Sequence, residues 1–348
     1  MPDLGFGGWA VLGLVLVLAI SFDFINGFHD TANAIATVIA TRVLSAGKAI
    51  MMAAVLNFVG ALTGQAVAKT ITSGLVDAEA VKALDFGSSQ VLIMAALVGA
   101  ITWNLITWYF GIPSSSSHAL IGGVVGAGLA ALGMEKVVWS GLVNKVVLPL
   151  ILSPIAGFVL SVLLMKLLFF LFAKATPSKV GGLFRRLQLV SSAFMAFSHG
   201  SNDAQKTMGV MTLALFSAGF PLALDANGTP NIPWEVILIA ATAMALGTAA
   251  GGWRIIRTMG QRLVHLEPIH GFAAETTAAT IIESASRFGF PLSTTHVISS
   301  CILGVGAARR LSGVRWGVAF NMVRAWIFTI PVCAAIAFVS YLILNLVF

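Results

Sequence analysis

Long apolar stretches, separated by short polar breaks, run through almost the whole chain. The clearest of these stretches are Val11–Ile20, Val91–Ile101, Val146–Phe172, Val236–Ala250 and Val318–Phe348. Because a helix needs about 20 apolar residues to cross the hydrocarbon core of a bilayer, we expect roughly 10–12 membrane segments, some of them short. The pattern therefore predicts an all-α integral membrane protein.

Two polar motifs interrupt the apolar pattern, and each occurs twice. Gly27–Asn33 (GFHDTAN) returns as Gly200–Lys206 (GSNDAQK), and Gly111–His118 (GIPSSSSH) returns as Gly289–His296 (GFPLSTTH). The second copies follow the first in the same order, at offsets of 173 and 178 residues. This repetition indicates two homologous halves. Polar segments broken by Gly or Pro at matching places in two hydrophobic halves are typical of the binding site of a transporter.

The repetition divides the chain into four parts. We expect a first repeat over residues 1–142, a linking helix and cytoplasmic loop over 143–186, a second repeat over 187–308 and a last membrane segment over 309–348. No part is polar enough to form a separate soluble domain.

The composition favours a protein embedded in lipid. Of 348 residues, 58% are hydrophobic and 9% are charged, and the mean hydropathy is +0.96. A soluble domain carries roughly 25% charged residues. The 20 Lys and Arg residues exceed the 13 Asp and Glu residues and give a net charge of +7. Because the basic residues are confined to short loops, this excess predicts membrane orientation, and nucleic acid is not an expected partner.

The distribution of charge predicts which face each loop occupies. Basic clusters such as Lys174–Arg186 and Arg309–Arg315 should lie in the cytoplasm, and the loop Asp225–Gly228 should lie outside. Asp3 precedes the first apolar stretch without any basic residue, so we expect both termini outside and no cleaved signal peptide. The two Asp motifs then start from opposite faces, which predicts repeats of inverted topology.

Asp30 and Asp203 are the carboxylates of the first motif pair. Each lies in an apolar helical context beside Gly and amide residues, including Asn33 for one and Asn202 for the other. Burying a carboxylate in a membrane is costly, so such a residue usually lines a pathway or cavity. The alternative is a carboxylate that caps a helix end at the interface. Carboxylate, amide and carbonyl oxygens together suit a small hard cation or an exchangeable proton.

The second motif pair predicts two helix starts inside the membrane. Pro favours the first helical position and hydroxyl residues favour the N-cap, so a new helix should begin after each Pro. Each break would form the tip of a re-entrant helical hairpin. Free N–H groups and the helix dipole at such a start attract an anion. The hydroxyls at the tips, which suit an oxyanion, belong to Ser114, Ser115 and Ser116 in the first half and to Ser293, Thr294 and Thr295 in the second. The alternative is an interfacial turn with solvated serines.

The presence of carboxylates beside the tips bears on which oxyanion binds. A carboxylate repels an anion unless the anion donates a proton or a cation bridges the two. Hydrogen phosphate and dihydrogen phosphate carry O–H groups, whereas sulfate at neutral pH carries none. Asp30 and Asp203 should therefore favour phosphate over sulfate.

All four motifs resemble the paired signatures and hairpin tips of the PiT family of inorganic phosphate transporters, and within it the bacterial low-affinity phosphate permeases. The resemblance covers nearly the whole chain. It implies symport of phosphate with protons or sodium by alternating access, through a bundle of inverted repeats with two re-entrant hairpins. It also implies that phosphate or the coupling ion contacts Asp30, Asn33, Ser115, Ser116, Asp203, Thr294 and Thr295. No cofactor and no metal site are implied, and the expected location is the bacterial plasma membrane.

One departure from the family pattern concerns the coupling ion. Sodium-coupled members carry a membrane Glu in each half, but here Glu275 of the second half is matched by Asn57 in the first. Lys206 occupies the place that Asn33 fills in the first half, and its charge could replace a cation. We therefore expect protons rather than sodium, with the coupling groups drawn from Asp30, Asn33, Asn202, Asp203, Lys206 and Glu275.

Several alternatives remain at this stage. The same tips could serve a carrier for sulfate or molybdate. A membrane-embedded enzyme that processes phosphoesters would need an asymmetric acid–base pair, whereas these polar groups are near-symmetric duplicates. A channel would need a ring of like groups. His118 and His296 end the tips and could either titrate or hold the tips by hydrogen bonds. Lipid and the anion are the expected partners, and a homo-oligomer is compatible with the sequence.

Overall fold

The computed structural model describes residues 4–348, and the described chain is built of helices. Asp3, on which the prediction for the amino terminus rests, lies outside the described residues. Short 3-10 turns and one π-helical stretch (Leu142–Val147) connect some of the α-helices. The α-helices are α1 Gly5–Ala40, α2 Ala46–Ala61, α3 Ala66–Ser73, α4 Ala78–Ala83, α5 Phe86–Phe110, α6 Ser116–Leu132, α7 Trp139–Gly141, α8 Leu148–Leu171, α9 Pro177–Ser217, α10 Trp234–Ala250, α11 Trp253–Gln261, α12 Pro268–Arg287, α13 Thr294–Arg309 and α14 Trp316–Leu344.

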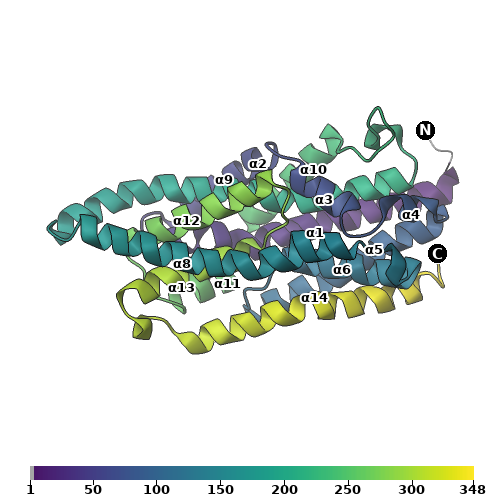
Figure 1. Ribbon diagram of the computed structural model, residues 1–348. Coiled ribbons are helices and arrows are strands. Elements are labelled where there is room, and N and C mark those ends of the chain that lie inside the picture. The colour runs from purple at the N-terminus through teal and green to yellow at the C-terminus, as the bar shows by residue number, and fades with distance from the viewer. Residues whose placement is uncertain (1–3) are drawn as a thin grey trace.

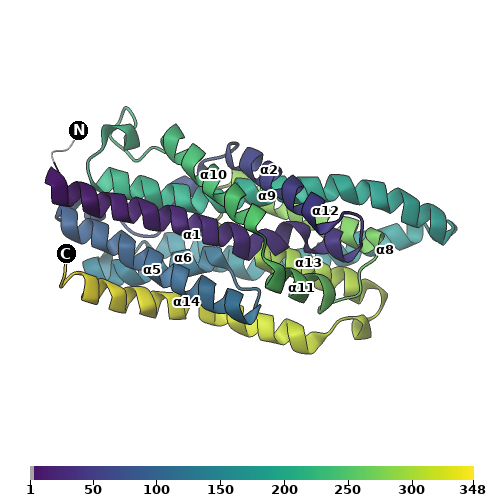
Figure 2. The ribbon, with the colours of Figure 1, turned by 180° about the vertical axis from the view of Figure 1, so that it is seen from behind.

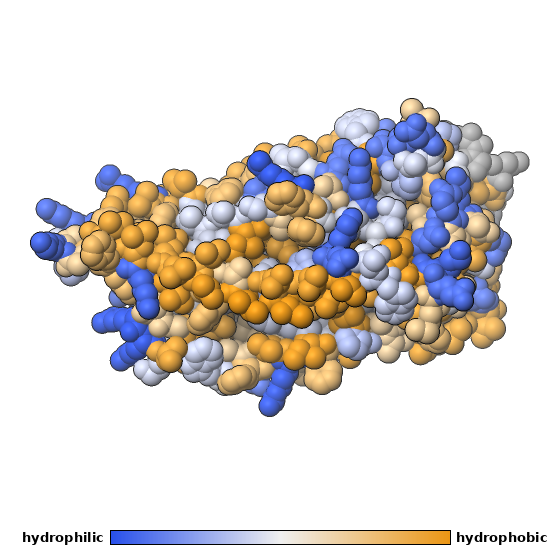
Figure 3. Space-filling model, in the orientation of Figure 1, coloured by the Kyte–Doolittle hydropathy of each residue, from blue (hydrophilic) through white to orange (hydrophobic). Residues whose placement is uncertain are grey.

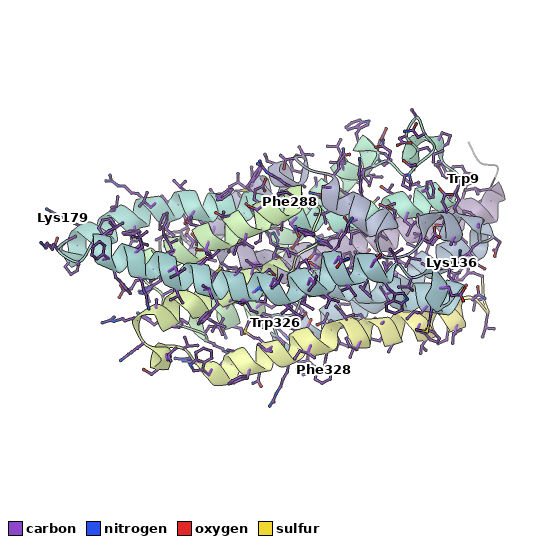
Figure 4. All side chains as sticks on the ribbon, viewed as in Figure 1. Trp9, Lys136, Lys179, Phe288, Trp326 and Phe328 are labelled. Atoms are coloured by element: carbon purple, nitrogen blue, oxygen red, sulfur yellow. The ribbon has the colours of Figure 1, made fainter. Side chains whose placement is uncertain are left out.

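Two long helices, α1 and α9, run through the centre of the molecule in opposite directions. They contain 36 and 41 residues, which at 1.5 Å per residue is about 54 and 62 Å. Helix α1 begins near Trp9 at one end of the molecule, whereas α9 begins near Lys179 at the other end (Figures 1 and 4). Both helices are therefore long enough to cross a bilayer with turns to spare.

The hydrophobic core consists of two clusters, and α1 and α9 contribute to both. One cluster takes Leu12 to Phe22 of α1 and Met208 to Phe216 of α9. The other takes Ala32 to Val38 of α1 and the earlier part of α9, up to Ala196. The polar motif of each helix lies between its two apolar segments. The two clusters thus enclose a polar layer in the middle of the bundle.

Both helix breaks expected at the Pro motifs are present. Helix α5 ends at Phe110, and Gly111 turns the chain with φ of +64° before α6 begins at Ser116. In the second half, Gly289 has φ of +73° before α13 begins. Glycine adopts this left-handed conformation without the steric cost that a Cβ brings. The Ser117 hydroxyl donates to the Leu292 carbonyl at 3.0 Å, so the two tips touch.

Helices that are far apart in the sequence pack against one another. Helix α10 packs on α1, α2 packs on α9, α14 lies along α6 and α8 lies along α13. Glycines allow these close approaches: a Cβ on Gly200 of α9 would overlap the Asn57 carbonyl of α2, and a Cβ on Gly27 of α1 would meet the Met244 carbonyl of α10. The halves are therefore interlocked rather than side by side.

Apolar length alone identifies fewer spans than the ten to twelve segments expected. Among the described residues, α1, α5, Trp139–Leu171 and α14 are long and apolar enough to cross a membrane. The pairs α2–α3 and α10–α11 pass the same test together but are bent by 69° and 70°. The remaining helices are too short, such as α6 with 17 residues and α13 with 16, or are interrupted by polar residues, such as α9. The molecule is an all-α membrane protein in which the central helices carry the polar residues.

The two ends of the molecule differ in charge and in the chain segments they hold. The start of α1 and the carboxyl end of the chain lie at one end of the bundle, and the loop between α8 and α9 lies at the other (Figures 1 and 2). Hydrophilic residues gather at both ends, with an apolar surface between them (Figure 3). Exposed apolar side chains of this surface include Ile155 and Leu163 of α8 and Ile327 and Phe328 of α14.

Candidate anion-binding site

The Asp motif of α1 meets the tip of its own half. Asp30 is 2% exposed, and its Oδ2 accepts a hydrogen bond of 2.6 Å from the hydroxyl of Ser116, the first residue of α6. Its Oδ1 lies 2.7 Å from Nδ1 of His29. The His29 Nε2 in turn lies 3.1 Å from the Thr107 hydroxyl of α5. This chain of contacts ties the carboxylate to both helices of the first hairpin.

The Asp motif of α9 meets the tip of the second half in the same way. The fully buried Asp203 accepts a hydrogen bond of 3.0 Å from the hydroxyl of Thr294, the first residue of α13. Lys206, one turn later on α9, donates to the other carboxylate oxygen. His199, one turn earlier, places Nε2 3.1 Å from Asp203 Oδ2. Removing two charges from water is costly, and close pairing of Lys206 with Asp203 offsets that cost.

The two motif pairs form one site. Asn33 of α1 donates to the hydroxyls of Thr294 at 3.1 Å and Thr295 at 2.9 Å, both on the tip of the other half. One ligand atom from each of Asp30, His199 and Asp203 lies within 4.8 Å of the others. Sequence positions more than 170 residues apart are thus brought into one buried cluster.

Other tip residues hold the tips in shape. Ser115 and Ser293 are the N-caps of α6 and α13, and each side-chain oxygen accepts from the backbone N–H three residues on, at 3.2 Å. Ser114 donates to the Thr107 hydroxyl at 2.8 Å. Six tip hydroxyls were predicted to contact the anion. Three of them, those of Ser114, Ser115 and Ser293, therefore form hydrogen bonds that shape the tips themselves. The hydroxyl protons of Ser115 and Ser293 are not used by these caps.

The electrostatics of the site combine donors for an anion with acceptors for a proton. Helices α6 and α13 both start at the site, so their free N–H groups and positive dipole ends lie beside Ser116 and Thr294. Lys206 adds an ammonium group, and Asp30 and Asp203 add carboxylate acceptors. An oxyanion that carries its own O–H group satisfies both kinds of partner.

Two predicted coupling residues lie away from this cluster. Asn202 donates to the Ser286 hydroxyl of α12 at 2.7 Å. Glu275 of α12 is fully buried and accepts from Thr37 at 2.5 Å, Ser191 at 2.5 Å and Gln188 at 3.1 Å. Thr37 comes seven residues after Asp30, so the Glu275 site lies about two turns, or 10 Å, further along α1.

The two tip histidines pack against each other and not against the carboxylates. The rings of His118 and His296 have centroids 4.9 Å apart, and His296 stacks on Trp326 of α14 at 4.0 Å. The Trp326 indole N–H donates to the Pro113 carbonyl at 3.0 Å. This stack clamps the first tip to α14.

His29, His199 and Asp23 are not among the site residues predicted from the sequence. The histidines do not align between the motifs, yet each contacts the Asp of its own motif. Spacing could have indicated His199, because residues four apart share a helix face. Residues seven apart also lie on one face of a helix, so the spacing between Asp23 and Asp30 would have placed both side chains on the same face of α1.

A cavity of about 740 Å³ opens at the end of the bundle that holds the basic loops. Its lining includes Thr41, Arg42, His265 and Arg315. The Thr41 hydroxyl donates to Gln188, which donates to Glu275, at 2.9 and 3.1 Å. A hydrogen-bonded chain therefore leads from this cavity to Glu275, whereas Asp30 and Asp203 are closed to solvent in this structure.

A duplicated polar site, closed between two helix starts in a bundle of membrane helices, defines the protein as a multi-pass membrane transporter. The phosphate transporter family matches residues 26–337. A probable low-affinity inorganic phosphate transporter of Bacillus subtilis (strain 168) is 48% identical over 335 residues, which make up 96% of this chain and 97% of that protein. One of Rhizobium meliloti (strain 1021) is 47% identical over 338 residues, or 97% of each chain.

The fold agrees with the family as well. A solved structure described as the sodium-dependent phosphate transporter matches 97% of this chain and 100% of its own, with a TM-score of 0.89 at 26% identity. The chain belongs to the phosphate transporter family. It is a transporter and not an enzyme, and the family indicates a substrate and a coupling ion but no cofactor.

Proposed function

We propose that this protein imports inorganic phosphate together with protons, by alternating access to the site formed by Asp30, Asp203 and the two hairpin tips. The observation that carries the proposal is the pair of contacts from Ser116 to Asp30 and from Thr294 to Asp203, at the starts of α6 and α13. Each contact puts a carboxylate next to a hydroxyl and a helix start. Phosphate would exchange these internal hydrogen bonds for its own.

Phosphate fits this arrangement better than sulfate does. A bound sulfate would present only acceptor oxygens to Asp30 and Asp203. Each sulfate oxygen would then face a carboxylate oxygen in a buried site with no hydrogen between them, which is costly. Hydrogen phosphate can donate to one carboxylate and accept from Thr294, Asn33 and Lys206. The names of the relatives support the same substrate.

Protons fit the coupling role better than sodium does. Lys206 pairs with Asp203, and its ammonium would repel a cation at that carboxylate. Asn57, in the place where the family pattern has a Glu, is fully buried and bonds to Thr248 and His199 at 2.8 and 3.2 Å. Sodium remains the alternative, because the structural relative is described as sodium-dependent.

The two halves are best treated as inverted repeats that include α8 and α14. Helices α1 and α9 run in opposite directions (Figure 1). Gly126 and Gly304, 178 residues apart, make the same kind of close approach, one to the Ala334 carbonyl of α14 and the other to the Phe158 carbonyl of α8. Beyond the shorter repeats of residues 1–142 and 187–308, we therefore propose repeats of α1–α8 and α9–α14.

The orientation we propose places the α8–α9 loop in the cytoplasm and both termini outside. Lys174, Lys179 and Arg185 lie in or near that loop, at the end opposite the termini, and basic residues favour the cytoplasmic side. The apolar surface between the two hydrophilic ends would face lipid (Figure 3). The plasma membrane of a bacterium is the expected location.

Binding measurements on the purified protein test the substrate. We expect labelled phosphate to be displaced by unlabelled phosphate but not by the same concentration of sulfate. Thr294→Val, which removes the hydroxyl that bonds to Asp203, should weaken phosphate binding by about tenfold or more, because a hydrogen bond to a charged group contributes about 1.5–3 kcal/mol. Thr242→Val is the matched control, since Thr242 is exposed and bonds to the Leu238 carbonyl of its own helix. Equal displacement by sulfate would contradict phosphate selectivity.

A further inference from the structure

A third carboxylate, Asp23, lies on α1 outside the anion-binding cluster. It is fully buried and precedes Asp30 by seven residues, which places it on the same helix face about 10 Å closer to the start of α1. Neither carboxylate oxygen has a hydrogen-bond partner. A buried carboxylate without a partner is costly, so this side chain has a role that the packed helices alone do not account for.

The side chains beside Asp23 are also unpartnered oxygens. Thr207 of α9 and Asn26 of α1 lie next to the carboxylate, and neither the Thr207 hydroxyl nor the Asn26 carbonyl oxygen has a partner. Thr207 and Asn26 are therefore polar neighbours of the carboxylate that form no hydrogen bond with it in this structure. A proton on Asp23 would change this, because the carboxyl O–H could donate to Asn26 or Thr207.

The charged groups around Asp23 come from α9. Lys206 and Asp203 act on its carboxylate with opposite signs. Helix α5 contains no Asp, Glu, His, Lys or Arg, and its one tyrosine, Tyr109, is exposed near its last turn. The acidic residue of α10, Glu235, is exposed at its first turn. On α1 itself the ionisable neighbours are His29 and Asp30. The charge on Asp23 is therefore coupled to the anion-binding cluster and to little else.

We infer that Asp23 carries the coupled proton, which rests on the proton–phosphate symport proposed above. In the outward-facing state, a proton from the extracytoplasmic water binds a carboxylate oxygen of Asp23 and forms a neutral carboxyl group. In the inward-facing state that O–H bond breaks, the proton passes to cytoplasmic water and the carboxylate is restored. No other bond is made or broken.

Electrostatics link this proton to the substrate. With Asp23 ionised, the three carboxylates of Asp23, Asp30 and Asp203 and the ammonium of Lys206 leave two net negative charges in a buried region. Phosphate adds more negative charge there, and repulsion is strong where water is excluded. Protonation of Asp23 removes one of these charges and so favours phosphate binding. By linkage, bound phosphate favours protonation of Asp23 to the same extent.

The test uses the full-length protein in proteoliposomes and separates exchange from accumulation. Exchange is followed as entry of labelled phosphate into vesicles loaded with unlabelled phosphate at equal pH, which requires no net proton release. Accumulation is followed under an inward pH gradient. Asp23→Asn, which mimics the neutral carboxyl, should keep exchange within about twofold and lose accumulation by about tenfold or more. Asp85→Asn is the matched control, because Asp85 is an exposed N-cap of α5 and Asn also caps helices.

A second variant keeps the carboxyl group. Thr207→Val removes the hydroxyl beside Asp23, whose O–H dipole can turn toward the ionised carboxylate and favour its charge. Without that dipole, protonation becomes easier. The external pH of half-maximal uptake should rise by roughly 0.5 or more, with exchange unchanged. An unchanged pH midpoint would contradict the proposal.

Other outcomes would also overturn it. Accumulation by Asp23→Asn at the wild-type level would show that the proton is carried elsewhere. Loss of exchange together with accumulation in this variant would assign Asp23 to substrate binding or to folding. Uptake driven by a sodium gradient in the wild type and lost in Asp23→Asn would make this a sodium site. Absence of phosphate exchange in the wild type is a separate result, which would overturn the proposed function and this inference with it.

Discussion

At the scale of single residues, the site depends on buried charges that balance one another. Asp203 and Lys206 are each at most 1% exposed and are paired. Removing one partner of a buried ion pair leaves the other charge uncompensated, whereas replacing both with neutral groups of similar size is often tolerated. The stability of the protein therefore depends on the Asp203 carboxylate, which is also the group that Thr294 contacts at the anion-binding site.

The ion pair leads to the first prediction. Asp203→Asn should destabilise the protein by about 3–5 kcal/mol, because it leaves the Lys206 ammonium buried without a counter-charge. The double variant Asp203→Asn/Lys206→Gln should recover most of this loss. Thermal unfolding in detergent measures both. A single variant as stable as the wild type would show that the ammonium is not buried with Asp203 as its partner.

Glu275 provides a second prediction. Three donors meet its carboxylate, so Glu275→Gln replaces an acceptor with a donor and should cost about 1–3 kcal/mol in stability. Glu275 touches no residue of the anion-binding site, so its contribution to the free energy of phosphate binding should be under about 1 kcal/mol. Phosphate affinity should therefore change by less than about fivefold. Glu235→Gln, at the exposed start of α10, is the control. Loss of phosphate binding as large as in Thr294→Val would place Glu275 in the binding site.

How far the sequence predicts the site depends on whether a contact is local. Asp30, Asp203 and the tip hydroxyls could be found from repeated motifs. That Asn33 bonds to Thr294, 261 residues away, depends on how the halves interlock, and no local spacing contains that information. The roles of Ser115 and Ser293 as caps follow from helix-start rules, yet the same hydroxyls also suit an anion, so the sequence alone did not choose between the two.

At the scale of helices, close packing through glycine determines which elements meet at the site. Gly200 lies between Ser198 and Asp203 on α9, and it lets α2 approach so closely that Asn57 reaches His199. A sequence pattern predicts the helices and their breaks, because Gly and Pro act locally. It does not predict the partner of each helix, and the packing of α14 along α6 appeared only in the structure.

The approach of α2 to α9 gives a third prediction. A Cβ on Gly200 would overlap the Asn57 carbonyl oxygen, so Gly200→Ala should separate the helices and destabilise the protein by about 1–3 kcal/mol. Gly181→Ala, in the first turns of the same helix with open space around an added Cβ, should be stabilising by about 0.5–1 kcal/mol. Unfolding temperatures of the two variants should therefore move in opposite directions. Equal shifts would contradict the packing.

At the scale of the whole molecule, the proposed membrane orientation rests on the arrangement of charge and apolar surface. The basic α8–α9 loop and the chain termini lie at opposite ends, separated by an apolar surface (Figures 1 and 3). The membrane class could be predicted from composition. The number of spans could not, because central helices such as α9 cross the bundle with polar residues that hydropathy excludes.

Single cysteines test this orientation. Lys179→Cys should react with a membrane-impermeant thiol reagent only from the cytoplasmic side, and Asp225→Cys only from the extracytoplasmic side. The native Cys301 and Cys333 are buried and should give little background. Labelling of both variants from one side would contradict the proposal that α9 crosses the membrane, because Lys179 lies at its start and Asp225 follows its end.

The central claim is that a pH gradient drives phosphate through the site between the two tips. Uptake of labelled phosphate into proteoliposomes, with a pH gradient or a sodium gradient imposed separately, tests it most directly. We predict accumulation under the pH gradient alone, none under sodium alone, and a loss of about tenfold in Thr294→Val. Uptake driven by sodium alone would contradict proton coupling, and absence of phosphate uptake under either gradient would contradict the proposed substrate.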